Sequence, residues 1–348
     1  MRFLKCMISS LFVFMFFSAC GTAKEPMPLF QEIPSQDGEE ARYVLLTHSE
    51  TTESTTHQLA CLFQQELEEI SAGRFRVSIY PNNTLGNLED GVHAFSSGAV
   101  EFRMGSGPSD LLQMVKWSPV LSDISIEEVN DMFQEKGDFW EAVQNECQLE
   151  QSQLLTIFPA EYRVLTSNRS VESCADLNGL RLRVPELGYD RQFWSGLGAS
   201  PYTAPIEAVY FELQQGQYEG QENTLSSIYS NRFYEYQDYL IETNHKIYFD
   251  SLYVSLPFYQ NLGDEERVWI DTASQRVYRH ACGLSETQQT QYWEDMKYEG
   301  IRQLEFPLEE QLVMREISVE GLTNSLKENY GAEKVAFLLS CLSQAGGN

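Results

Sequence analysis

The hydrophobic pattern of this chain switches repeatedly between the period of a strand and the period of a helix, and this feature restricts the fold more than any other. After the N-terminal region, an apolar run typical of a buried strand is followed by a helical stripe, and the same order then repeats. The pattern predicts strands at Tyr43–Thr47, Phe75–Tyr80 and Val100–Met104, with helices at Thr55–Ser71 and Leu88–Ser97 between them. Because strands that a helix connects pair in parallel, this order predicts an α/β fold with mostly parallel sheets and helices on both faces.

A second β/α run follows in residues 162–242. Its predicted strands lie near Arg163–Thr166, Leu180–Val184, Ser200–Thr203 and Tyr239–Glu242. About 305 of the 348 residues are expected to fold, which exceeds the ~250 to 300 residues at which a single core stops growing. Two such units therefore predict two lobes around a cleft. We expect a strand at Ser251–Leu256 to return to the first lobe, so that the chain crosses between lobes near residues 160 and 250.

The last third of the chain is predicted to be mainly helical. Asp264–Tyr298 is a long segment that would extend ~52 Å as one helix at ~1.5 Å per residue, unless Gly283 kinks or splits it. A strand at Arg302–Phe306 and two or three helices follow, ending at Ala345. We expect residues 42–160 and 249–285 to form the first lobe. Residues 161–248 and 286–348 are expected to form the second lobe, which includes the C-terminal helices.

The N-terminus has the pattern of an export signal. Arg2 and Lys5 precede an apolar run over Met7–Phe17 that is too short for a membrane-spanning helix. This pattern predicts a signal peptide over residues 1–19. The sequence Phe-Ser-Ala-Cys that ends at Cys20 resembles a bacterial lipobox, with Phe17 in place of the usual leucine. Either Cys20 is lipidated, or the signal is removed by plain cleavage nearby; residues 20–41 are then a tether.

The charge of the chain excludes one class of partner. The formal net charge is −27, and removal of the signal peptide with its two cations makes it −29. Such an acidic surface repels nucleic acid and anionic lipid headgroups, so no nucleic-acid partner is expected. An anionic ligand would instead need locally concentrated arginine.

Cysteine and histidine spacing does not favour a metal site or an enzyme. The five cysteines after Cys20 lack CxxC spacing, and only a bridge between Cys282 and Cys341 is a speculative pairing. No H-x-x-x-H, G-x-S-x-G or P-loop motif is present. Glu219 and Glu222 form the one possible acid/base pair. We therefore expect no metal, no cofactor and no catalytic residues.

The stretch Asp176–Glu186 is the most informative for function. Its first residues form a turn at Gly179, and the alternation that follows shows its arginines on one face of a strand. Pro185 ends that strand, so Arg183 lies near a strand end, where ligands commonly bind in α/β sheets. An arginine held there is either a bidentate carboxylate receptor or a structural salt-bridge residue.

Three segments together carry a resemblance to a known family. They are Arg163–Asn168, Asp176–Glu186, and Val209–Asn223 with its sequence VYFELQQGQYEGQEN. In this order and spacing they resemble the substrate-binding subunit of tripartite ATP-independent periplasmic (TRAP) transporters, the dicarboxylate-binding DctP-like family. The resemblance is collinear from Arg163 to His245 and looser elsewhere. It implies a two-lobed periplasmic-binding-protein-like fold with a long helix across both lobes.

The resemblance also implies function. It carries ligand-binding roles onto Arg163, Arg183 and Asn223. It further implies that the protein binds a small organic acid, a monocarboxylate or a dicarboxylate, and delivers it to integral membrane permease subunits. The alternatives are that Arg163 pairs with Glu161 or Glu186, and that Asn223 caps the helix that starts near Leu225.

The predicted first lobe departs from the family, which leaves the ligand undefined. Relatives bring polar or acidic residues to the ligand after the third strand, whereas this chain has Gly105–Asp110 there. The family's Leu-Pro-Phe segment appears as Trp117–Leu121. A second function on the same fold, that of a sensory or structural lipoprotein, therefore stays open.

Overall fold

The computed structural model describes residues 41–85, 93–185 and 188–347. The predicted signal peptide, Cys20, nearly all of the tether and part of the predicted helix at Leu88–Ser97 lie outside these residues. Among the described residues, no helix is long and apolar enough to cross a membrane. The described residues contain no group of three or more acidic, histidine or cysteine side chains that could hold a metal ion.

The first sheet is built largely from the N-terminal β/α run. Its strand order is β2 (Phe75–Tyr80), β1 (Arg42–Thr47), β3 (Phe102–Gly105), β10 (Ser251–Ser255) and β4 (Ser152–Ile157). The three N-terminal strands pair in parallel, as predicted, and β10 pairs antiparallel with both of its neighbours. Helix α1 (Thr55–Ile70) begins at Ser54, whose hydroxyl accepts a hydrogen bond from the backbone N–H of His57. The apolar stripe of α1 packs on this sheet through Leu59, Phe63 and Leu67.

The second sheet contains the other β/α run. Its order is β11 (Arg302–Leu304), β9 (Tyr239–Tyr248), β5 (Glu161–Ser167), β8 (Gly220–Thr224), β6 (Arg181–Val184) and β7 (Ser200–Thr203). Helices α7 (Gly188–Gly196), α8 (Ile206–Gln214) and α9 (Leu225–Ser230) and the short turns η1 (Cys174–Leu177) and η2 (Phe233–Tyr236) connect or follow these strands. Strands β6, β7 and β8 are parallel, whereas β5 runs antiparallel to both β8 and β9.

Strand β8 was not among the strands predicted from the sequence pattern. All five residues of Gly220–Thr224 are buried, although none is apolar except glycine. Gly220 is needed here because a Cβ atom at this position would lie 2.5 Å from the carbonyl oxygen of Thr166 on β5. A central strand made of Gly-Gln-Glu-Asn-Thr carries polar side chains into the interior, where each needs a partner.

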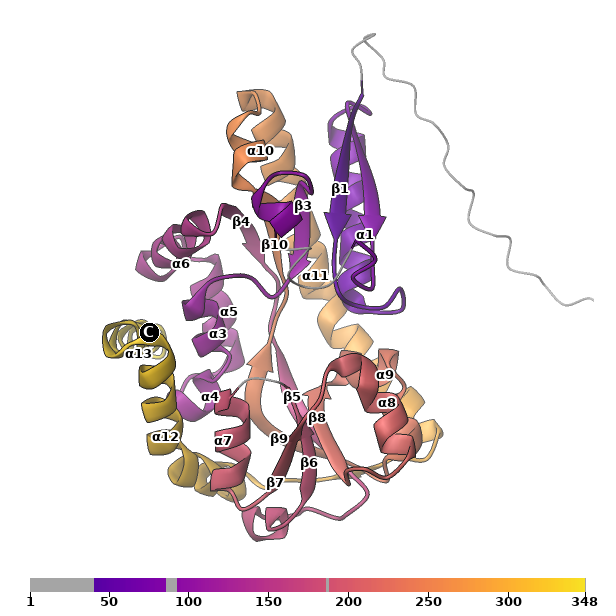
Figure 1. The fold of residues 1–348 in the computed structure, drawn as a ribbon, viewed down its shortest axis with the longest axis vertical. Coiled ribbons are helices and arrows are strands. Elements are labelled where there is room, and N and C mark those ends of the chain that lie inside the picture. The colour runs from indigo at the N-terminus through magenta and orange to yellow at the C-terminus, as the bar shows by residue number, and fades with distance from the viewer. Residues whose placement is uncertain (1–40, 86–92, 186–187, 348) are drawn as a thin grey trace, which may run out of the picture. The chain divides into compact units, whose positions relative to one another are not determined.

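The chain crosses between the two sheets at the expected places. Strand β4 belongs to the first sheet and β5 to the second, and β9 and β10 are divided in the same way. Helix α11 (Asp264–Tyr298) is one unbroken helix, so Gly283 does not split it. Its first half packs into the core of the first sheet through Ile270 and Val277, and its second half joins the core around α9 through Met296 (Figure 1). The exact division into two lobes stays a prediction.

A helical layer that the sequence pattern did not resolve lies between β3 and β4 in the chain. It consists of α3 (Asp110–Val115), α4 (Ser118–Leu121), α5 (Ile126–Gln134) and α6 (Asp138–Leu149). The short α10 (Leu256–Gln260) follows β10, and α12 (Leu308–Tyr330) and α13 (Ala332–Ala345) end the chain. Helix α12 packs on α7 and α4, and α13 packs on α3, α5 and α6 (Figure 1).

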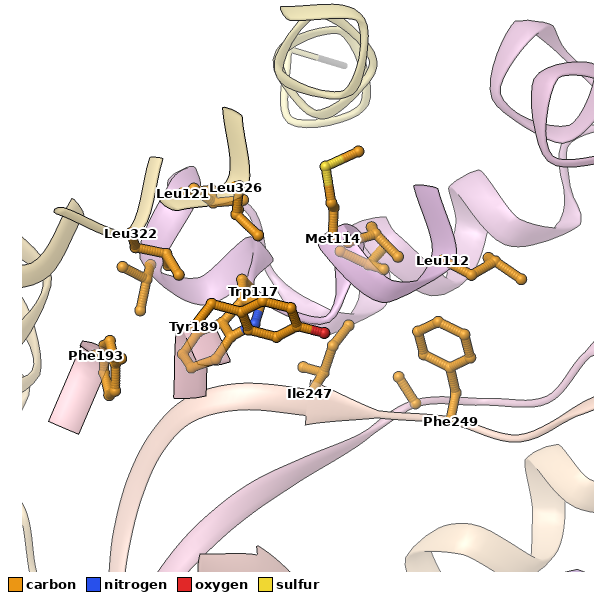
Figure 2. Close-up of a cluster of buried hydrophobic side chains, with 14 of the residues drawn as sticks. Leu112, Met114, Trp117, Leu121, Tyr189, Phe193, Ile247, Phe249, Leu322 and Leu326 are labelled. Atoms are coloured by element: carbon orange, nitrogen blue, oxygen red, sulfur yellow. The ribbon is translucent and has the colours of Figure 1, made fainter. Parts of the chain in front are cut away.

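Trp117 is at the centre of the largest core. Its side chain is fully buried, with its ring centroid 6.2 Å from that of Tyr189 and 4.9 Å from that of Phe193, both on α7. In Figure 2, Trp117 overlaps Tyr189, while Phe193 and the leucines of α12 lie beside and above them, and Ile247 of β9 lies beneath. The Trp117–Leu121 segment therefore joins α7, α12 and β9, and fixes the position of the residues that immediately precede it.

The speculative disulfide is wrong. All five cysteines among the described residues are free, with Cys282 exposed on α11 and Cys341 buried on α13. Cys147, Cys174 and Cys341 are buried and act as small apolar side chains.

Candidate functional site

A cavity of about 220 Å³ lies between the two sheets. Arg163 of β5, Arg183 of β6 and Asn223 of β8 all line it, so the structure brings together the three residues that the sequence singled out. The rest of the lining comes from the N-terminus of α1 and from the segments where the chain crosses between the sheets. It includes Ser54, Thr55, Thr56, Leu59, Phe158, Glu161, Tyr248, Phe249 and Asp250.

Arg183 is a buried cation without a carboxylate partner. It is 3% exposed, and its Nε and Nη2 groups donate hydrogen bonds of 2.9 and 2.5 Å to the carbonyl oxygen of Ala204. No carboxylate among the described residues lies within ion-pair distance of it. A guanidinium has five N–H donors, so the Ala204 carbonyl orients Arg183 and leaves donors for another group. Burial lowers the pKa of Arg183 from its ordinary value, although an arginine remains charged.

Arg163 has a different environment, because it is paired with Glu222 of β8. Its Nε lies 2.5 Å from Glu222 Oε2 and its Nη2 lies 2.9 Å from Oε1, while Nη2 also donates to the Glu222 carbonyl. Both residues are buried, and Nε2 of His245 lies 3.2 Å from the same carboxylate. Burial alone would raise the pKa of Glu222, but Arg163 and His245 bring it well below its ordinary value.

This pair corrects two interpretations. The partner of Arg163 is Glu222 and not Glu161, whose carboxylate instead accepts a hydrogen bond of 3.1 Å from Ser226. Glu186 lies outside the described residues. Glu219 and Glu222 also do not act together, since Glu219 accepts from the backbone N–H of Arg181 at 3.1 Å. Glu222 is therefore a structural carboxylate that neutralises Arg163.

Asn223 is not a helix cap. The residue that caps α9 is Thr224, whose hydroxyl accepts from the backbone N–H of Ser227 at 3.2 Å. Asn223 is 5% exposed, and its Oδ1 accepts a hydrogen bond of 3.1 Å from the backbone N–H of Thr224. Its amide nitrogen makes no hydrogen bond to another described residue, so it can donate to a molecule in the cavity.

Three further carboxyl groups line the cavity, those of Glu50, Glu161 and Asp250. Asp250 accepts hydrogen bonds from the hydroxyls of Thr56 at 2.5 Å and Tyr248 at 3.0 Å. Burial raises the pKa of Glu161 to about 7, and burial together with Asp250 raises the pKa of Glu50 to about 7. Near neutral pH, Glu50 and Glu161 are therefore partly protonated and can both donate hydrogen bonds to hydroxyl groups and accept them.

A second cavity of about 580 Å³ adjoins the first and shares Arg163, Pro185 and Tyr248 with it. Residues 103–108, which begin on β3, form one wall, and Lys116 and Lys246 also line it. Lys246 pairs with Asp190 at 2.6 Å. Lys116 was not singled out from the sequence, where it is the one charged residue in the run Leu-Leu-Gln-Met-Val-Lys-Trp. The glycine-rich segment Gly105–Pro108 thus lines a cavity, in keeping with its departure from the family pattern.

The chain is similar in sequence to known solute-binding proteins. The family model described as bacterial extracellular solute-binding protein, family 7 (DctP), matches residues 46–329. A solute-binding protein of Roseobacter denitrificans is 28% identical over 248 residues, which cover 69% of this chain and 74% of the relative. The sialic acid-binding periplasmic protein SiaP of Vibrio cholerae is 28% identical over 254 residues, covering 71% of this chain and 78% of that protein.

The fold has close solved counterparts. A TRAP periplasmic solute-binding protein from Roseobacter denitrificans with bound L-galactonate aligns with a TM-score of 0.71 and 24% identity, covering 86% of this chain and 98% of that one. At this level of identity, the likeness concerns the fold. The predicted fold class is confirmed: mixed α/β, with two sheets, matching two-lobed periplasmic binding proteins.

Proposed function

Because the chain belongs to the bacterial extracellular solute-binding proteins of family 7, the substrate-binding subunits of TRAP transporters, we propose that it binds a small organic acid and delivers it to integral membrane permease subunits. The relatives are solute-binding proteins of transporters, so the chain is a binding protein and not an enzyme, as predicted. The family also supports a location in the periplasm.

The observation that carries the proposal is Arg183. It is a buried guanidinium, oriented by the Ala204 carbonyl and without a carboxylate partner among the described residues, in a cavity between two sheets. A ligand carboxylate would accept its remaining donors as a charge-assisted pair, which is strong in a site away from water. Arg163 adds an oriented donor without net charge, because Glu222 neutralises it. Asn223 adds an amide donor.

The carboxyl groups that line the cavity suggest the rest of the ligand. Glu50, Glu161 and Asp250 provide hydrogen-bond acceptors, and the partly protonated groups provide donors, so they suit hydroxyl groups. The Roseobacter denitrificans protein has L-galactonate bound, which is a polyhydroxy acid. A hydroxylated organic acid bound with its carboxylate on Arg183 is therefore our assignment for this chain.

The experiment replaces Arg183 and measures affinity by calorimetry. Native mass spectrometry of freshly purified protein first identifies any co-purified acid, and galactonate serves as the initial probe. We expect Arg183→Ala to lose ~2 to 5 kcal/mol of binding free energy, because the bound carboxylate would be left without its partner. This corresponds to roughly 30-fold to several-thousandfold in affinity. Arg183→Lys should also bind poorly, since an ammonium lacks the planar fork. A folded Arg183→Ala protein that binds within threefold of wild type would contradict the proposal.

We further propose that Cys20 is lipidated and anchors the protein to a membrane on the periplasmic side. This rests on the lipobox resemblance alone, in a part of the chain outside the described residues. Replacing Cys20 with serine should release the protein into the soluble fraction. Unchanged fractionation with membranes would exclude this anchor.

A further inference from the structure

We propose that Lys116 and Arg103 form a second anion-binding subsite at the far end of the cleft, so that the natural ligand is an organic dianion. One anionic group would bind Arg183 and the other would bind this pair. The inference rests on the proposed function and deepens it, because it names the charge of the ligand. The second group is a carboxylate or a phosphate, and the experiment below separates these two.

Lys116 is a buried ammonium without an acidic partner. It is 6% exposed, and its Nζ donates to Ser106 Oγ at 2.9 Å and Gln113 Oε1 at 3.2 Å. The ring centroids of Tyr248 and Phe249 lie 5.0 and 5.6 Å from Nζ. No carboxylate among the described residues is within 4.0 Å of it. Burying a charge without a counter-charge is unfavourable, so the site is incomplete as it stands.

Arg103 lies on the wall of the same cavity and also lacks an acidic partner. It belongs to β3, opposite Tyr253 of β10, and its guanidinium makes no hydrogen bond or ion pair with another described residue. Burial lowers the pKa of Arg103 from its ordinary value. Arg103 is half-buried, and no carboxylate among the described residues lies within ion-pair distance to compensate its charge.

Lys116 and Arg103 differ from the other cations that line this cavity, because those have carboxylate partners. Lys246 is paired with Asp190, and Arg163 is paired with Glu222. The chain contains 51 acidic residues and only 24 lysines and arginines, so carboxylates are abundant. Two inward-facing cations that lack a carboxylate, in so acidic a protein, indicate a place for an anion that the chain does not itself supply.

The backbone beside these cations is shaped for close approach. Gly105 has a φ of 133°, a conformation that side chains rarely adopt. A Cβ atom on Gly107 would lie 1.9 Å from the hydroxyl oxygen of Tyr253. The Gly-Ser-Gly sequence thus lets the backbone lie directly on Tyr253 while Ser106 contacts Lys116. This loop keeps the cavity open at the point where a second anionic group would sit.

The two cavities adjoin each other and share three lining residues. Arg163, Pro185 and Tyr248 line both, so an extended molecule with its first carboxylate on Arg183 can reach Lys116 past the neutralised Arg163–Glu222 pair. Burial and repulsion from Lys246 lower the pKa of Lys116 to about 7. Attraction to Asp250 and Asp190 offsets this shift only partly. A bound anion would favour the charged form of this lysine.

The test compares acids that differ only in their second anionic group. Calorimetry measures galactarate against galactonate, which share a carbon skeleton but carry two carboxylates and one, respectively. It also measures 3-phosphoglycerate against glycerate. We expect wild type to bind the dianion of at least one pair about tenfold tighter or more, and the pair that shows the preference identifies the group as a carboxylate or a phosphate.

The variants are Lys116→Met and Arg103→Gln, with Arg276→Gln as the control. Arg276 is a partly exposed arginine paired with Glu66 outside both cavities, and its loss removes the same charge. We expect the first two variants to lose the preference for the dianion, with monoanion affinity unchanged within threefold, and the control to keep the preference. Lys116→Met should also retain its melting temperature, since it removes an uncompensated charge; a lower value would indicate a structural role.

The outcomes separate the inference from the proposed function. Equal binding of both members of each pair, with affinity that depends on Arg183, overturns the dianion subsite and leaves the proposed function in place. A preference that survives both substitutions also overturns it. Failure of wild type to bind any of the four acids counts against the subsite and the proposed function together.

Discussion

At the residue scale, two arginines with the same predicted role differ because of their partners. Arg183 donates to a carbonyl oxygen and has no carboxylate partner among the described residues, whereas Glu222 neutralises the charge of Arg163. Loss of Arg183 should therefore affect mainly binding. Loss of Arg163 should affect mainly folding, because it leaves the fully buried carboxylate of Glu222 with only the ring of His245 as a partner.

This difference is testable with Arg163→Ala. Removing one member of a buried ion pair costs about 3 to 5 kcal/mol, so we expect a clearly lower melting temperature for the apo protein. Arg183→Ala, measured in parallel, should melt close to wild type. The double variant Arg163→Met with Glu222→Gln removes both charges and should regain part of the loss. Wild-type stability of Arg163→Ala would contradict the inference that Glu222 depends on Arg163 for its counter-charge.

The raised pKa values of Glu50 and Glu161 predict a pH dependence with a definite sign. The pKa of each carboxyl rises from 4.5 to about 7 in the folded state, so between these values the folded state binds more protons than the unfolded state. Their contribution to stability is therefore present below pH 4.5 and is lost as pH rises toward 7. Relative to wild type, Glu161→Gln should gain stability as pH rises from about 5 to 8. Melting temperatures of wild type and Glu161→Gln are measured over this range. A constant difference between the two proteins at every pH would mean that the pKa of Glu161 is not raised.

At the element scale, periodic hydrophobic patterns correctly predicted the helices and strands that bury one apolar face. Strand β2 and helix α11 match the predicted bounds, and α1 differs by one residue at its end, because one face of each packs on a core. Strand β8 was missed because its five residues are polar or glycine and are stabilised by partners from other elements. Arg183 and Asn223 could be singled out through the family resemblance. Lys116 could not, because its significance depends on which groups are absent around it.

Gly220 and Gly283 provide a matched pair of substitutions on β8 and α11. Gly220→Ala would place a Cβ atom 2.5 Å from the carbonyl oxygen of Thr166, so β8 must move away from β5 and take Glu222 and Asn223 with it. We expect lower stability and weaker ligand binding. Gly283→Ala meets no atom within 4 Å in a helix interior and should be stabilising by about 0.5 to 1 kcal/mol. Calorimetry measures the thermal stability and the ligand affinity of both variants. Equal effects of the two substitutions would contradict the close packing of Gly220 against β5.

At the scale of the whole described chain, the two sheets are connected by crossing strands and by a continuous helix. The β4–β5 and β9–β10 segments carry Glu161 and Asp250 into the cavity, so the residues that line the site also lie where the chain passes between sheets. A ligand held by both walls would bind a closed arrangement more tightly than an open one, and this difference in affinity is what can drive closure.

This argument predicts compaction on binding. Helix α11 packs on α1 in one core and on α9 in another, so it should permit bending and oppose wide separation of the sheets. Small-angle X-ray scattering of wild type should show a smaller radius of gyration at saturation with an acid that calorimetry has shown to bind. Arg183→Ala at the same concentration should keep the radius of the free protein, because it lacks the contact that anchors the acid to the second sheet. An unchanged radius for saturated wild type would mean that the cavity is already in its ligand-bound form, and that the carboxylate enters without movement of one sheet toward the other.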